Sequence, residues 1–144
     1  MSTESPFLDI LFVYGTLLKD AEHLMSSYLL ERSTFLGPGM MPGQLYKVDF
    51  YPGAIHDPAS ETQVYGELYQ LSEPQKVLEV LDGYEGFDPQ NEAHSLFRRT
   101  QVEIMQDGNL LTSWVYVYNQ SPEGFPLIPS GDFLKYEFQQ IKTS

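Results

Sequence analysis

The amino-acid sequence predicts an α+β domain whose sheet is strongly curled or closed around a core. Ten prolines and 11 glycines fall between short apolar runs, a pattern typical of many short strands joined by tight connections. Few segments have the apolar spacing of a helix, so we expect helices to flank the sheet. With 144 residues, of which 42% are apolar and only 19% charged, the chain can bury a sizeable core. We therefore expect a single domain over residues 1–144, with residues 1–8 as a flexible N-terminal tail.

The first elements are expected to be a buried strand and then a helix. Residues 10–14 form an apolar run that ends at Gly15, which is typical of a strand running into a turn. Asp20 can cap a helix that continues to about residue 30. Glycines and prolines then interrupt residues 33–42 repeatedly, and we expect a variable loop there.

Several short strands follow. We expect them over residues 45–48, 53–56, 64–71, 97–105 and 111–118. The last two flank Asp107-Gly108-Asn109, which is a strong signal for a β-hairpin.

A second helix is expected between the third and fourth of these strands. Ser72 and Gln75 have the spacing of a capping box at its start. Gly83 is the expected end, because glycine commonly terminates helices in the left-handed conformation. The tail over residues 131–142 is a further candidate helix.

Composition excludes several classes of function. The chain has 8 basic and 20 acidic residues and a net charge of −12, which argues against nucleic acid or an anionic membrane as partner. Absence of cysteine excludes disulfides, thiolate metal sites and a cysteine nucleophile. The sequence has no apolar run long enough to span a bilayer and no positively charged start of a signal peptide, so we expect a cytoplasmic location.

The remaining chemistry is acid–base catalysis by carboxylates and tyrosines. His23, His56 and His94 lie far apart and have no metal-ligand spacing, so no metal site is expected. The motifs of α/β-hydrolases, dinucleotide-binding folds and P-loops do not occur.

Two segments are candidates for a site. In Tyr14-Gly15-Thr16-Leu17 a strand runs into a glycine turn, where successive N–H groups can converge on an anion; a plain strand-to-helix turn is the simpler interpretation. Glu85 lies between aromatic and glycine residues, and partial desolvation would raise its pKa and suit it to proton transfer. The simpler interpretation of Glu85 is one more solvated acid among 20.

Together these segments resemble the γ-glutamylcyclotransferase-like family, also called AIG2-like. Tyr14-Gly15-Thr16-Leu17 at the end of the first strand and Leu81-Asp82-x-x-Glu85-Gly86 after a helix resemble two blocks of this family. Further blocks follow in the family's order: Gly43-x-Leu45-Tyr46, Tyr51-Pro52-Gly53-Ala54, Val64-x-Gly66-Glu67-Leu68-Tyr69, Phe97-x-Arg99-x-x-Val102-x-Ile104, Trp114-Val115-Tyr116-Val117-Tyr118 and Ile128-Pro129-Ser130-Gly131-Asp132-Phe133. The order and spacing of the blocks favour the site interpretation of both segments.

The resemblance implies a fold and a reaction. The fold would be a small mixed β-barrel or strongly curled sheet flanked by a few helices. The reaction would release 5-oxoproline from a γ-glutamyl amine or γ-glutamyl amino acid by attack of the substrate's own α-amine. Glu85 would act as general base and then acid, and neither metal nor cofactor would be required.

The resemblance also implies how substrate is bound. Backbone N–H groups of Gly15, Thr16 and Leu17 would hold the substrate carboxylate, in agreement with the shortage of cations. Tyr14 would either contact the substrate or close the first strand as a core ring, and Tyr118 is a weaker candidate for the pocket wall. Arg99 is expected to form a structural ion pair, and the acids other than Glu85 are expected to be solvated surface.

Some features depart from the family pattern or leave an alternative open. Phe97 stands where the family more often has tyrosine, and Tyr-Gly-Thr-Leu resembles the γ-glutamylamine cyclotransferase and bacterial AIG2-like branch. Specificity for the leaving group is expected in loops 33–42, 88–95 and 120–129. The alternative functions are a non-catalytic module that keeps the fold and binds a small ligand, and an enzyme of the same fold that acts on another small amide or amine.

Overall fold

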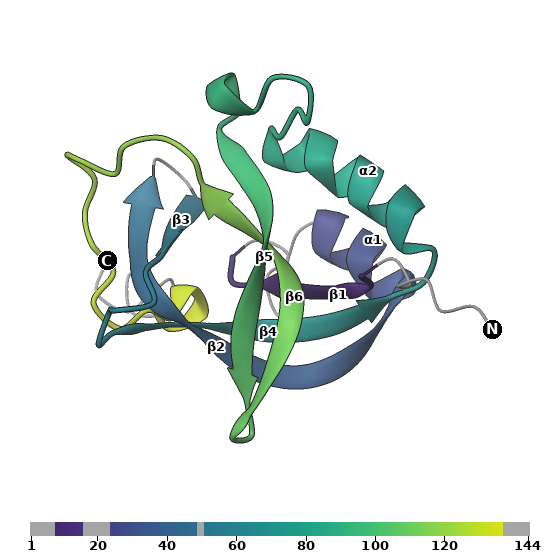
Figure 1. The fold of residues 1–144 in the computed structure, drawn as a ribbon, viewed down its shortest axis with the longest axis horizontal. Coiled ribbons are helices and arrows are strands. Elements are labelled where there is room, and N and C mark those ends of the chain that lie inside the picture. Colours follow the sequence, from purple (N-terminus) through teal and green to yellow (C-terminus); the bar gives the residue numbers. More distant parts are fainter. Residues whose placement is uncertain (1–7, 16–23, 49–50, 137–144) are drawn as a thin grey trace.

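The computed structural model describes residues 8–15, 24–48 and 51–136, and in that part of the chain six strands form one sheet (Figure 1). The elements follow one another as β1 (Ile10–Val13), α1 (Leu24–Glu31), β2 (Ser33–Val48), β3 (Tyr51–His56), β4 (Gln63–Leu71), α2 (Pro74–Glu85), the 3₁₀ helix η1 (Glu92–His94), β5 (Phe97–Gln106) and β6 (Asn109–Tyr118). The expected start of the first helix at Asp20 lies outside the described residues.

Five of the strands close into a mixed barrel. Their order is β2-β4-β1-β6-β5, and a pairing of β2 with β5 at Met40 and Met105 completes the ring. The pair β1–β6 is parallel and the other pairs are antiparallel. The strand β3 pairs with the last part of β2 and lies outside the ring. The expected α+β fold with a small mixed barrel and a few helices is confirmed.

The expected loop over residues 33–42 is wrong, because this stretch belongs to the 16-residue strand β2. Its first part pairs with β4 and its last part with β3, and a bulge lies between Phe35 and Gly37. Glycine and proline therefore mark bends of a strand that changes partners while it wraps around the barrel. These residues are tolerated inside the strand because it curves where they occur.

Both ends of α2 differ from the expectation. The residue before the helix is Glu73 in a left-handed conformation with φ 48°, and no side chain caps the first turn, so the capping box from Ser72 is wrong. At the other end the helix continues through Gly83 and stops at Gly86, whose φ is 72°. The amide of Phe87 donates to the carbonyl of Asp82 at 2.9 Å, which closes the last turn. Glu85 is consequently the last residue of the helix.

The hairpin at the end of the sheet is confirmed. Asp107 and Gly108 both have positive φ, at 51° and 82°, and connect β5 directly to β6. In the tail, residues 133–136 are helical, and residues 137–142 of the expected helix lie outside the described residues.

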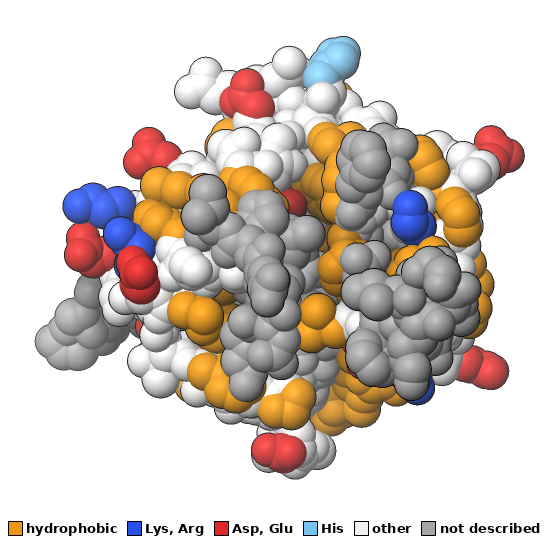
Figure 2. Space-filling view, turned by 180° about the vertical axis from the view of Figure 1, so that it is seen from behind, with side chains coloured by type: hydrophobic (Ala, Val, Ile, Leu, Met, Phe, Trp, Pro, Cys, Tyr) orange, Lys and Arg blue, Asp and Glu red, His pale blue; other side chains and the backbone are white. Residues whose placement is uncertain are grey.

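Apolar side chains fill the barrel and the space under the helices. The short strand β1 is buried on both faces, because α1 and α2 lie on the same side of the barrel next to it (Figure 1). On the face shown in Figure 2, charged side chains lie mainly around the margin, whereas hydrophobic side chains gather nearer the centre. Neither α-helix in the described part of the chain has the length and apolar character needed to cross a membrane.

Candidate active site

A cavity of about 480 Å³ opens where the ends of β1 and α2 approach the start of β3. Its described lining residues are Phe12, Val13, Tyr14, Gly15, Tyr51, Pro52, Gly83, Tyr84, Glu85, Gly86, Leu96, Phe97 and Tyr116. Within this described lining, Glu85 is the only carboxylate, and there is no lysine, arginine or histidine. The cavity is therefore an aromatic and apolar pocket around one acid. The structure thus brings Tyr14, Gly15 and Glu85 together, as expected from the sequence.

Glu85 projects from the last turn of α2 and is partly buried. Loss of solvent around the carboxyl group raises its pKa from 4.5 to about 8. None of the described residues donates a hydrogen bond to this carboxylate. The group can therefore exchange a proton with a molecule in the cavity near neutral pH.

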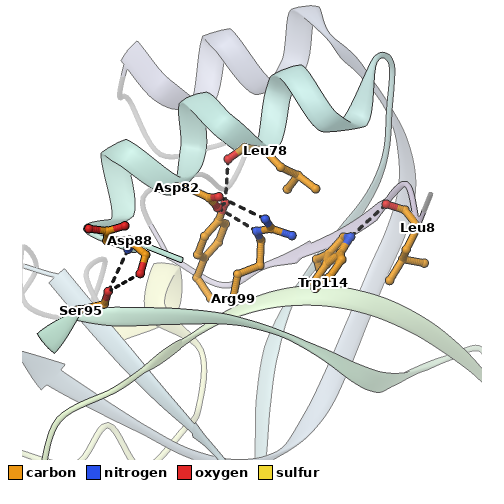
Figure 3. A network of polar contacts seen from close by, with 8 residues as sticks. Leu8, Leu78, Asp82, Asp88, Ser95, Arg99 and Trp114 are labelled. Carbon is orange, nitrogen blue, oxygen red and sulfur yellow. Dashed lines mark hydrogen bonds and ion pairs between the residues drawn. The ribbon is translucent and has the colours of Figure 1, made fainter. Parts of the chain in front are cut away.

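Asp82, one turn earlier on α2, holds the helix against the sheet (Figure 3). Arg99 of β5 donates from Nε to Oδ1 at 2.8 Å and from Nη2 to Oδ2 at 3.1 Å. The hydroxyl of Tyr116 on β6 donates to Oδ1 at 2.6 Å. The Arg99 guanidinium also lies 4.4 Å from the ring centroid of Trp114, a cation–π contact. The structural ion pair expected for Arg99 is confirmed, whereas the expectation that every acid other than Glu85 is solvated is wrong for Asp82, which is 8% exposed.

Asp82 and Glu85 have different environments although they lie on the same face of α2. Residues three apart in a helix lie on the same face. Asp82 faces β5 and β6, and Glu85 reaches the cavity beyond the last contact with those strands. Sequence reasoning missed this relationship, because the helix was expected to end at Gly83, before Glu85.

The hydroxyl of Tyr14 is engaged by the protein. It donates to the backbone carbonyl of Tyr116 at 2.6 Å and accepts from the backbone N–H of Ala54 at 3.1 Å. Burial, and to a smaller extent the charge of Glu85, raises the pKa of this hydroxyl, so it stays protonated. Tyr14 thus joins β1 to β6 and β3, while its ring forms part of the cavity lining.

Gly15 lies at the edge of the cavity, directly against β3. A Cβ atom at this position would come within 2.7 Å of Cγ of Pro52. Any larger residue would therefore push β3 outwards or displace the turn. Thr16 and Leu17, the other expected anion-binding residues, lie outside the described residues.

Tyr118 is not among the described residues that line the cavity. Its ring packs edge-on against Phe97, with 5.6 Å between ring centroids, and Phe97 does line the cavity. A Cβ on Gly53 would lie 3.0 Å from Cβ and Cγ of Tyr118. Tyr118 therefore lies behind the wall, where it supports Phe97 and the strand β3.

Sequence reasoning missed several lining residues. Tyr51 and Pro52 of β3 form one wall, and Tyr84 and Leu96 contribute from the end of α2 and from the segment before β5. The block Tyr51-Pro52-Gly53-Ala54 is part of the family resemblance, but nothing local in the sequence indicates that it faces Glu85. Of the three expected specificity loops, residues 33–42 are a strand, and neither 88–95 nor 120–129 supplies a residue to the described lining.

Comparisons with known proteins agree with this picture. The family model described as "Gamma-glutamyl cyclotransferase, AIG2-like" matches residues 11–135. A curated relative from Niallia circulans, Gamma-L-glutamyl-butirosin B gamma-glutamyl cyclotransferase, is 29% identical over 115 residues, which are 79% of this chain and 69% of the relative.

Solved structures share the fold. The protein YkqA from Bacillus subtilis superposes with a TM-score of 0.71 and 22% identity, over 94% of this chain and 43% of YkqA. This chain thus spans less than half the length of YkqA. An AIG2-like protein from Mus musculus has a TM-score of 0.66 and 22% identity, over 85% of this chain and 87% of the mouse protein.

Proposed function

The chain belongs to the gamma-glutamyl cyclotransferase, AIG2-like family, and from this premise we propose that it releases 5-oxoproline from a γ-glutamyl amine or a γ-glutamyl amino acid. The nucleophile is the α-amine of the substrate itself. Its nitrogen attacks the γ-carbonyl carbon to close a five-membered ring, and the bond between that carbon and the leaving nitrogen breaks. The products are 5-oxoproline and a free amine or amino acid, and no water is consumed.

Glu85 is proposed to carry the proton. It takes a proton from the substrate ammonium group, which leaves the nitrogen free to attack, and then gives a proton to the departing nitrogen. The observation that supports this role is that Glu85, with a pKa raised to about 8, is the one carboxylate among the described residues of an otherwise apolar cavity. Because the raised pKa of Glu85 is closer to that of an amine than an ordinary glutamate pKa is, proton transfer from the substrate ammonium group to Glu85 is less unfavourable.

The backbone N–H groups of Gly15, Thr16 and Leu17 are proposed to bind the α-carboxylate of the substrate. Backbone donors are suited to this task because the described cavity lining has no cationic side chain. The Tyr14 hydroxyl is occupied by backbone groups, so we propose that its ring packs on the γ-glutamyl chain. Holding that flexible chain in its cyclising conformation removes much of the entropic barrier. The scheme needs neither a metal ion nor a cofactor.

The leaving group is proposed to lie between Leu96, Phe97 and Tyr51. These side chains exclude water around the reacting amide, which strengthens proton transfer to and from Glu85. Tyr118 acts indirectly in this scheme, by keeping the Phe97 ring in place.

The test offers the purified protein a panel of γ-glutamyl amines and γ-glutamyl amino acids, with 5-oxoproline measured by mass spectrometry. We expect release from at least one compound, and a loss of kcat of about 10²–10⁴-fold in Glu85→Gln, because the proton shuttle is removed. Glu79→Gln is the matched control, since it removes an exposed carboxylate from the same helix and should leave turnover unchanged.

Two outcomes would contradict the proposal. A Glu85→Gln variant as active as the unsubstituted protein would exclude Glu85 as proton carrier. Tight binding of a panel compound by calorimetry, without any 5-oxoproline, would favour the non-catalytic binding module, since a carboxylate in an apolar pocket can also hold an amine.

A further inference from the structure

Tyr116 is the residue at which the two halves of the cavity meet. Its side-chain hydroxyl donates to Oδ1 of Asp82 on α2 at 2.6 Å. Its backbone carbonyl accepts from the Tyr14 hydroxyl at 2.6 Å. One residue of β6 thus contacts both the helix that ends in Glu85 and the segment that leads from β1 to Gly15.

On the helix side, the contact fixes the turn that carries Glu85. The Tyr116 hydroxyl also reaches the carbonyl of Leu78 at 3.4 Å, so it touches two successive turns of α2. Asp82 is almost fully buried, and a hydrogen bond to a buried carboxylate is stronger and more directional than one between neutral groups. Because Glu85 lies three residues beyond Asp82, its direction into the cavity follows from this anchor.

At the end of β1, the backbone carbonyl of Tyr116 fixes Tyr14, the residue just before Gly15. Tyr14 immediately precedes Gly15, and its hydroxyl spans from Tyr116 to the backbone of Ala54 on β3. The Tyr116 carbonyl is fixed in turn by its place in β6, which pairs with β1 and β5. Tyr116 therefore links Gly15 to Glu85 through two hydrogen bonds, in addition to the Arg99 contacts that hold Asp82.

Cyclisation is sensitive to that separation. A γ-glutamyl substrate would be held by its α-carboxylate at the turn, while its α-amine must reach Glu85 and the γ-carbonyl together. A misplacement of about 1 Å in such an arrangement can cost about 10²-fold in rate. We propose that Tyr116 is a positioning residue that holds Glu85 and the turn at Gly15 at the distance that cyclisation requires, an inference that rests on the proposed function.

Tyr116 does not itself move the proton in this scheme. Burial, together with the hydrogen bond to Asp82, raises the pKa of its hydroxyl, which remains a donor to Asp82 at neutral pH. Its effect on the reaction is exerted through Asp82 and Tyr14. A variant that keeps the ring and removes only the hydroxyl should therefore loosen the helix side alone, while Arg99 still holds Asp82.

The test compares Tyr116→Phe with Tyr69→Phe in the full chain. Tyr69 is a matched control, because it is fully buried, its hydroxyl also donates to a carboxylate (Glu67 Oε1, 2.8 Å), and it is not among the described lining residues. We expect Tyr116→Phe to lower kcat about 10- to 100-fold with little change in KM. Tyr69→Phe should leave both constants unchanged.

A second readout does not depend on turnover. The pKa of Glu85 is measured by NMR in protein labelled at glutamate side-chain carboxyl carbons. Release of the helix end admits water, so in Tyr116→Phe this pKa should fall from about 8 towards the ordinary value of glutamate. In Tyr69→Phe it should not move.

Tyr14→Phe tests the strand side. It removes the bond to the Tyr116 carbonyl while leaving the bond from Tyr116 to Asp82 in place. Because the turn then loses its anchor, KM should rise more than kcat falls, which is the opposite of the pattern expected for Tyr116→Phe. If Tyr116→Phe does not fold, Tyr14→Phe alone still tests the coupling, because it removes the bond to the Tyr116 carbonyl and should raise KM.

The positioning role would be overturned by unchanged kcat and an unchanged Glu85 pKa in folded Tyr116→Phe, or by equal losses in Tyr69→Phe. Failure of the proposed function has a different signature, namely no 5-oxoproline from the unsubstituted protein with any compound. In that case the NMR titration still decides: a Glu85 pKa that falls only in Tyr116→Phe supports the coupling, and one that stays the same contradicts it.

Discussion

The two ends that meet at the cavity are held in different ways. The C-terminal turn of α2 is anchored by charge, through the buried pair of Asp82 and Arg99. The end of β1 is anchored by neutral contacts: the Tyr14 hydroxyl bonds two backbone groups, and Gly15 fits against Pro52. The charged anchor satisfies Asp82 completely and leaves Glu85, one turn further on, without a described hydrogen-bond donor. A site can thus keep one carboxylate reactive by using another to fix the backbone that carries it.

The largest effect is expected from breaking the charged anchor. Arg99→Met leaves the buried carboxylate of Asp82 without its cation, which should lower the free energy of unfolding by about 3–5 kcal/mol. Chemical denaturation measures the change. Lys76→Met is the matched control, because it removes the cation of the exposed pair with Glu73 on the same helix, a pair worth about 0–1 kcal/mol. Similar losses in the two variants would show that burial of the anchor adds nothing.

An intermediate effect is expected from pH, and it concerns the helix end only. The folded protein holds a proton on Glu85 up to a pKa of about 8, whereas the unfolded chain releases it near 4.5. The folded state therefore binds more protons between these values, so stability is full below about pH 4.5 and is lost as the pH rises through about 8. Each pKa unit corresponds to about 1.4 kcal/mol, and partial exposure of the carboxylate reduces the total to about 1–3 kcal/mol.

Urea denaturation at pH 5, 7 and 9 measures this dependence, with Glu85→Gln as reference. The difference in unfolding free energy between the two proteins should shift in favour of Glu85→Gln as the pH rises. A parallel pH dependence in both proteins would mean that the carboxyl group of Glu85 titrates normally.

The smallest effect is expected at the neutral anchor. Gly15→Ala places Cβ against Pro52, and overpacking of this kind costs about 1–3 kcal/mol, with the lower end expected because the contact is at the cavity edge. KM should rise as the turn is displaced. Pro52→Ala in the same protein removes the clashing atom and should restore part of both quantities.

Gly83→Ala provides the contrast on the helix side. A Cβ at this position meets no atom within 4 Å, and alanine is favoured over glycine in a helix by about 1 kcal/mol, so stability should rise. If Gly15→Ala also stabilised the protein, the tight fit between β1 and β3 would not be an anchor.

The end of β1 and the end of α2 differ in how much of each could be predicted from the sequence, because local patterns are visible in a sequence and long-range contacts are not. Tyr14, Gly15 and Glu85 line one cavity, and each could be singled out from a local pattern near the end of a strand or helix; their roles at a site stay a prediction. The role of Asp82 was missed, although its spacing from Glu85 was visible, because a lone sequence does not show whether an acid is buried. The strand over residues 33–42 was missed because glycine and proline were interpreted as breaks, whereas pairing with β4 on one side and curvature of the barrel accommodate them.

The sequence by itself determined the number and order of most strands and the hairpin at Asp107-Gly108, since these depend on neighbouring residues and turn chemistry. It also showed directly that the chain is acidic and has few cations. Only the tertiary structure decided which groups meet at the cavity. The Tyr14 hydroxyl bonds a residue 102 positions away, and Asp82 bonds residues 17 and 34 positions away. Such contacts depend on closure of the barrel and on burial, which no local pattern encodes. Burial also raises the pKa of Glu85 and so gives one acid among 20 its distinct chemistry.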